Sequence, residues 1–128
     1  MKEVDFVSEW FRFADNDLCV ARHCFEDMRP KQTEISCYHC QQCAEKALKG
    51  YLVYKGISEP PKIHNLENLC KLCEDFDKSF SKILDICADL TLFGTAVRYP
   101  NELAPDDNIV KQAIKKAQKI YDFCKSKI

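Results

Sequence analysis

Apolar residues recur every three or four positions along the C-terminal stretch from residue 109 to residue 128. This spacing places them on one face of an α-helix, with lysines mainly on the opposite face. The apolar set is Ile109, Val110, Ala113, Ile114, Ala117, Ile120, Tyr121, Cys124 and Ile128, and the basic set is Lys111, Lys115, Lys116, Lys119 and Lys125. We expect the lysines to form a solvated face; nucleic-acid binding by them is the minority interpretation. Such a helix must bury its apolar face against other elements.

Four further segments have the same helical spacing. They run from about Val4 to Met28, from Thr33 to about Lys55, from Asn65 to about Phe76, and from Phe80 to about Gly94. Thr33 and Asn65 are the expected N-caps of their helices, and Gly56 is expected to stop the second helix. No segment alternates apolar and polar residues over a useful length. The sequence therefore predicts a single domain over residues 1–128, an all-α antiparallel bundle of four to five helices.

Composition restricts the partners of such a bundle. The chain has 128 residues and a net charge of −1, which argues against a broad electrostatic grip on nucleic acid. No stretch approaches the roughly 20 apolar residues of a membrane span. The first residues, "MKEVDFVSEWF", lack the continuous apolar core of a signal peptide. We therefore expect a cytoplasmic protein that does not enter a membrane.

The sequence contains nine cysteines, five of them in the runs Cys37-x-x-Cys40-x-x-Cys43 and Cys70-x-x-Cys73, with His39 and His64 nearby. A structural zinc site is one interpretation of this spacing. However, the first run continues to Gly50 without a helix breaker, so it is typical of a helix rather than of a tight metal-binding turn. We expect the cysteines to act as small buried apolar residues, and we expect no metal or cofactor. A structural metal and reactive thiols are the minority alternatives.

Three charged residues lie close together on the second expected helix: Glu45, Lys46 and Lys49. Glu45 and Lys49 are four residues apart, in the order that favours an ion pair. Such pairs usually form only a solvated stripe on a helix, and this is the simpler interpretation. The functional alternative is that Glu45 and Lys49 face Arg98 and form part of one polar groove.

Arg98 belongs to the stretch "VRYPNE", between the fourth and fifth expected helices. Pro100 disfavours the α conformation at Tyr99, so the chain should be extended there and should point Arg98 and Tyr99 in defined directions. Arginine suits two-pronged contact with phosphate or carboxylate, and tyrosine offers a ring for stacking and a hydroxyl group. The structural alternative is that Arg98 pairs with a helix C-terminus or an acidic neighbour. Chemistry alone gives the two interpretations equal weight.

Four motifs in series resemble the HEPN domain, a helical module of prokaryotes and eukaryotes. They are "FADNDLCVA" (residues 13–21), "CQQCAEKALKGYL" (40–52), "IHNLENL" (63–69) and "AVRYPNE" (96–102), and they span nearly the whole chain. The resemblance implies a bundle of four or five helices that is commonly a homodimer and for which nucleotide binding has been proposed. It also implies a partner, because many bacterial members are encoded beside a minimal nucleotidyltransferase. Some of these pairs act as toxin–antitoxin systems.

One branch of the family is a ribonuclease, in which a histidine follows an arginine after four to six residues. Arg98 approximately matches that arginine, but no histidine follows residue 64. We therefore expect a non-catalytic accessory module that binds a nucleotide, a substrate or a partner protein, and we expect no catalytic residue. The alternatives are a ribonuclease toxin that recruits His64 and a homodimeric scaffold. The candidate binding residues are Arg98, Tyr99, Pro100, Glu45, Lys46 and Lys49.

Overall fold

The computed structural model describes residues 5–94 and 104–128. Within these ranges the chain forms helices and no strand. The elements are α1 (Phe6–Glu26), α2 (Thr33–Tyr54), α3 (Leu66–Glu74), the 3-10 helix η1 (Lys78–Ile83), α4 (Leu84–Thr91) and α5 (Asp107–Lys125). The predicted all-α bundle is confirmed. The predicted turn at Arg98, Tyr99 and Pro100 lies outside the described residues.

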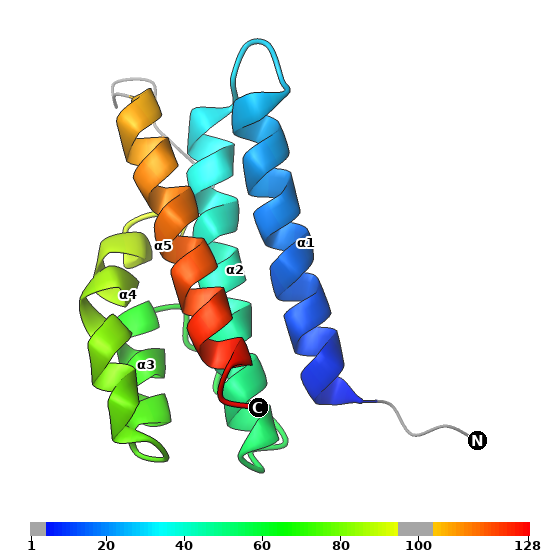
Figure 1. Cartoon of the computed structure of the whole chain (residues 1–128), viewed down its shortest axis with the longest axis vertical. Coiled ribbons are helices and arrows are strands. Elements are labelled where there is room, and N and C mark those ends of the chain that lie inside the picture. Colours follow the sequence, from blue (N-terminus) through cyan, green and yellow to red (C-terminus); the bar gives the residue numbers. More distant parts are fainter. Residues whose placement is uncertain (1–4, 95–103) are drawn as a thin grey trace.

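Helix α2 occupies the centre of the bundle. It packs against α1, α3, α4 and α5, and most of its residues from Ser36 to Leu52 are buried. Figure 1 shows α1 antiparallel to α2, with α5 beside α2 and the shorter α3 and α4 against one side of the long helices. Among the described helices, none combines the length and the apolarity needed to cross a membrane.

Side-chain caps explain where several helices begin. Asn65 was predicted to cap α3, and its side chain accepts a hydrogen bond of 3.0 Å from the backbone N–H of Asn68. Asp106 caps α5 in the same way. The predicted cap at Thr33 is wrong, because α2 begins at Thr33 and its N-cap is Gln32, whose side chain makes no capping bond. The predicted stop at Gly56 is confirmed: Gly56 has a φ of 100°, a left-handed conformation that glycine adopts without strain.

The fourth predicted helix is divided in two. Residues 78–83 form η1, and α4 starts only at Leu84. Asp77 causes the early start, because its carboxylate accepts a hydrogen bond of 2.9 Å from the backbone N–H of Ser79 and so favours a tight turn. On α5, the predicted burial of Ile109 is wrong, since its side chain is 43% exposed in the first turn.

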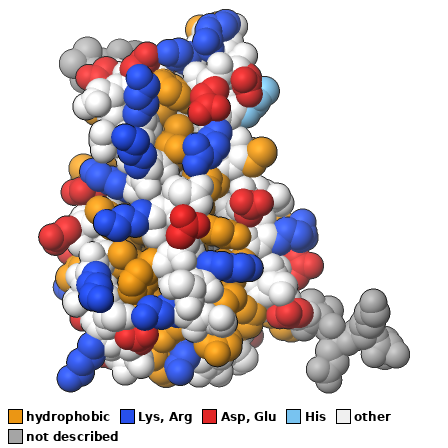
Figure 2. All heavy atoms as spheres, viewed as in Figure 1, with side chains coloured by type: hydrophobic (Ala, Val, Ile, Leu, Met, Phe, Trp, Pro, Cys, Tyr) orange, Lys and Arg blue, Asp and Glu red, His pale blue; other side chains and the backbone are white. Residues whose placement is uncertain are grey.

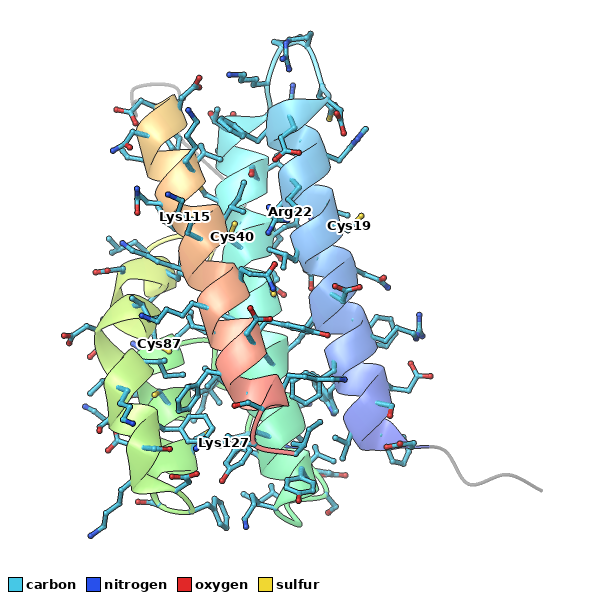
Figure 3. All side chains as sticks on the ribbon, in the orientation of Figure 1. Cys19, Arg22, Cys40, Cys87, Lys115 and Lys127 are labelled. Carbon is cyan, nitrogen blue, oxygen red and sulfur yellow. The ribbon has the colours of Figure 1, made fainter. Side chains whose placement is uncertain are left out.

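The cysteines are a major part of the core. Eight of the nine thiols are buried, and only Cys19 is exposed. Figure 3 shows Cys40 and Cys87 inside the bundle and Cys19 on the outer side of α1. All nine are free, and burial raises the pKa of the Cys37 thiol to about 11. The prediction that the cysteines act as small core residues is confirmed for eight of them and is wrong for Cys19.

The lysines of α5 form the solvated face that the sequence predicts. Lys111, Lys115, Lys119 and Lys125 are exposed, and Lys116 is half-buried and pairs with Asp89 at 2.9 Å. Figure 2 shows basic side chains on this face of the molecule with acidic side chains scattered among them. Positive charge is therefore not concentrated in one uniform patch on this face.

Candidate functional site

A buried carboxylate on the central helix gathers polar groups from two parts of the chain. The side chain of Glu45 is only 7% exposed. Its Oε2 accepts a hydrogen bond of 3.2 Å from Nζ of Lys49, and its Oε1 lies 3.0 Å from Nδ1 of His64 and 3.4 Å from Nε2 of Gln41. We call these four residues, Gln41, Glu45, Lys49 and His64, the Glu45 cluster.

The linker between α2 and α3 brings His64 to this place. After Gly56 the chain turns back along α2, and Nε2 of Gln41 donates a hydrogen bond of 3.0 Å to the carbonyl oxygen of His64. This contact fixes the backbone of His64 beside Glu45. The His64 side chain is 73% exposed, so the imidazole ring bridges a buried carboxylate and the solvent.

The predicted ion pair between Glu45 and Lys49 is confirmed, but its predicted solvation is wrong. The Lys49 side chain is 8% exposed, because α1 and the returning linker cover this side of α2. Removing two charges from water is expensive, and the attraction between them repays this cost only when further hydrogen bonds support the pair. His64 and Gln41 supply these bonds to Glu45.

Lys46, the third candidate on α2, belongs to a different group of side chains. Its Nζ contacts the carboxylate of Asp17 on α1, whose side chain is 10% exposed. The other oxygen of this carboxylate lies 2.8 Å from Nδ1 of His39. The structure thus brings Glu45 and Lys49 together and gives Lys46 a separate partner on α1.

The Glu45 cluster lies next to Gly94, the last described residue before Arg98. A Cβ atom built on Gly94 would lie 3.7 Å from Cδ and Nε2 of Gln41. Residues 95–103 follow directly, and the candidates Arg98, Tyr99 and Pro100 are among these undescribed residues. Gln41 therefore lies close to both Glu45 and Gly94.

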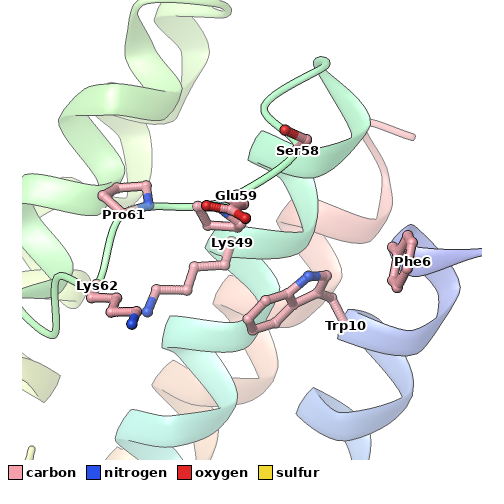
Figure 4. A pocket seen from close by; sticks show the side chains of 8 residues that line it. Phe6, Trp10, Lys49, Ser58, Glu59, Pro61 and Lys62 are labelled. Atoms are coloured by element: carbon pink, nitrogen blue, oxygen red, sulfur yellow. The ribbon is translucent and has the colours of Figure 1, made fainter.

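An open pocket lies on the other side of Lys49. It has a volume of about 680 Å³ and is bounded by the first turns of α1, by Lys49 and by the linker. Its lining residues are Phe6, Trp10, Lys49, Ser58, Glu59, Pro60, Pro61 and Lys62 (Figure 4).

Among residues 5–94 and 104–128, no three His, Cys, Asp or Glu side chains are arranged to hold a metal ion.

The sequence did not predict Gln41, Asp17 or Trp10 as parts of these sites. Two of them left a signal. Gln41 precedes Glu45 by four residues and so shares its helix face. Asp17 falls in register with the buried Ala14 and Ala21 of α1, where a charged residue needs a partner. Trp10 lies at a pocket only because of the path of the linker, and no pattern in the sequence predicts that path.

Comparison with known proteins identifies the family. The family model described as HEPN domain matches residues 7–127. The solved structure "Crystal Structure of ST0689, an archaeal HEPN homologue" is similar, with a TM-score of 0.70, 27% identity, and coverage of 99% of this chain and 98% of the other. TT1696 from Thermus thermophilus has the same fold, with a TM-score of 0.78, 24% identity, and coverage of 98% and 100%. No functionally curated protein gives a significant match. Because the family match spans almost the whole chain, the protein belongs to the HEPN domain family.

Proposed function

We propose that this HEPN protein is a non-catalytic accessory module of the cytoplasm. It binds a nucleotide or a substrate and partners a minimal nucleotidyltransferase in a two-component, toxin–antitoxin-like system. The observation that supports this proposal is the Glu45 cluster, since stability alone does not account for a buried ion pair, and binding is the role that we assign to it. The cluster lies next to Gly94, which precedes Arg98 by four residues in the sequence.

In this proposal each candidate residue has one role. Arg98 contacts a phosphate or an acidic group of the ligand or partner, because its guanidinium can donate two parallel hydrogen bonds. Tyr99 stacks on a ring or donates a hydrogen bond, and Pro100 fixes the direction of both side chains. Glu45 and Lys49 flank this group, and Lys46 supports α2 against α1 through Asp17.

The proposal is tested by replacing Arg98 and measuring partner binding. A minimal nucleotidyltransferase encoded beside this protein should co-purify with it and should bind at least about tenfold more weakly to Arg98→Ala, for the loss of a charge-assisted contact. Arg12→Ala is the matched control, because Arg12 forms an exposed ion pair with Glu9 on the outer side of α1. Equal binding of partner and nucleotide by Arg98→Ala and the wild type would refute the site assignment.

A second candidate function is RNA cleavage, and His64 is the observation that favours it. A buried carboxylate at 3.0 Å orients the imidazole ring while the ring itself remains exposed, which is an arrangement used for general acid–base catalysis. A ribonuclease would cut RNA when purified, and His64→Ala would abolish this cutting. RNA that stays intact with the purified wild-type protein excludes this candidate.

A third candidate function is a homodimeric scaffold. Phe6, Phe13 and Val20 are large exposed apolar side chains that recur at intervals of seven residues along α1. This spacing places them on one side of the helix, where a second subunit could cover them. Light scattering should then give twice the mass of a single chain, which is 14.9 kDa. A monomer in solution would argue against a scaffold role.

A further inference from the structure

The pocket beside Lys49 is lined by the ammonium group of this residue. A lysine ammonium group has three N–H donors. In the described part of the chain, one Lys49 N–H donates to Glu45, and no second acceptor contacts this nearly buried group. The ammonium group also lines the open pocket, so its other N–H donors can reach an acceptor that enters it.

A second cation faces the same space. Lys62 is exposed on the linker and has no carboxylate partner among residues 5–94 and 104–128. Figure 4 shows the side chains of Lys49 and Lys62 extending toward the same part of the pocket, which Glu59 also lines. Glu45 compensates the charge of Lys49, and the ammonium group of Lys62 adds a further positive charge beside this pair, which would attract an anion into this part of the pocket.

The opposite wall of the pocket offers an aromatic surface. Trp10 and Phe6 of α1 line it, and Pro60 and Pro61 form its linker side. The indole ring of Trp10 stands across the pocket from the two lysines (Figure 4). A flat apolar wall of this kind stacks on planar rings. The volume of about 680 Å³ falls in the range of about 300–1,000 Å³ that is typical of small-molecule sites.

We propose that this pocket binds a small molecule in which a phosphate group is attached to a planar ring. The phosphate lies between the ammonium groups of Lys49 and Lys62. The ring stacks on Trp10. This inference rests on the proposed function, because it gives the small-molecule ligand of the accessory module a place and a chemical class and leaves Arg98 and Tyr99 to contact the partner protein.

Trp10 makes the proposal directly measurable, because it is the only tryptophan in the chain. The ¹H–¹⁵N spectrum of the full chain therefore contains one indole N–H signal, and this signal reports on the pocket. The probe is phenyl phosphate, compared with inorganic phosphate, which lacks the ring, and benzyl alcohol, which lacks the charge. We expect phenyl phosphate to move the indole signal in a saturable way and at lower concentration than either comparison compound.

Two lysine variants test the site. Lys62→Gln should weaken phenyl phosphate binding about tenfold, for the loss of one charge-assisted contact. Lys71→Gln, which removes an exposed lysine of α3 outside the pocket, should bind like the wild type. Lys49→Met should also weaken binding, and if it unfolds the chain, Lys62→Gln alone decides. No saturable shift, or equal weakening by Lys62→Gln and Lys71→Gln, would overturn the proposal.

The titration also separates this inference from the proposed function. If phenyl phosphate does not bind in the pocket, partner binding should still depend on Arg98. Failure of Arg98→Ala to weaken partner binding would leave the phenyl phosphate titration unchanged. An equal response to inorganic phosphate and phenyl phosphate would overturn the assignment of a planar ring.

Discussion

Replacing Glu45 with leucine is expected to destabilise the protein strongly. The change leaves the ammonium group of Lys49, whose side chain is 8% exposed, without its carboxylate partner. Breaking a buried ion pair by removing one partner costs about 3–5 kcal/mol, and we expect the lower end, about 3 kcal/mol, because Lys49 also lines an open pocket. Urea unfolding followed by circular dichroism, at one fixed protein concentration, measures this free energy.

The double variant Glu45→Leu/Lys49→Met sharpens the test. It removes both buried charges, so most of the lost stability should return, since apolar replacements of buried ion pairs are often neutral. The control is Glu9→Leu/Arg12→Met, an exposed pair whose removal should change stability by less than about 1 kcal/mol. A cost below about 1 kcal/mol for Glu45→Leu, or a double variant no more stable than Glu45→Leu, would refute the argument from burial.

Three further predictions concern the bundle itself. Gly50→Ala should lower the free energy of unfolding by about 1–2 kcal/mol in urea titrations, because its Cβ would lie 2.9 Å from Cε2 of the buried Phe11, and this overpacking exceeds the gain in helix propensity. A thiol reagent at pH 8 should react rapidly with one group per folded chain, the exposed Cys19, because burial raises the pKa of thiols such as that of Cys37, and with all nine after unfolding. Asp106→Ala should cost about 1 kcal/mol in the same urea assay, because its carboxylate caps α5. A stabilised Gly50→Ala, several fast thiols, or an unchanged Asp106→Ala would contradict the respective argument.

The helices were predictable because their determinants are local. The apolar spacing of α5 and the stop at Gly56 depend on neighbouring residues. The structure confirms the stop, and it confirms the apolar face of α5 except at Ile109 and Ile128, which are exposed. The division of the fourth helix was not predicted, although Asp77 is a visible capping residue, because the competition between a 3-10 turn and an α-turn depends on how Phe80 packs into the core.

The burial of Glu45 could not be predicted from helix periodicity. Its spacing to Lys49 gave the ion pair correctly, but the exposure of that pair depends on a linker that turns back after Gly56. The contact that holds the linker, from Gln41 to the carbonyl oxygen of His64, joins residues 23 positions apart. Sequence spacing on one helix contains no information about such a contact.

Affinity capture from the native lysate tests the central proposal most directly. The tagged wild-type chain and Arg98→Ala are each used as bait, and bound proteins are identified and quantified by mass spectrometry. The proposed function predicts a minimal nucleotidyltransferase bound to the wild-type chain and depleted from Arg98→Ala. Bound RNA without a nucleotidyltransferase, or a nucleotidyltransferase that binds both baits equally, would contradict it.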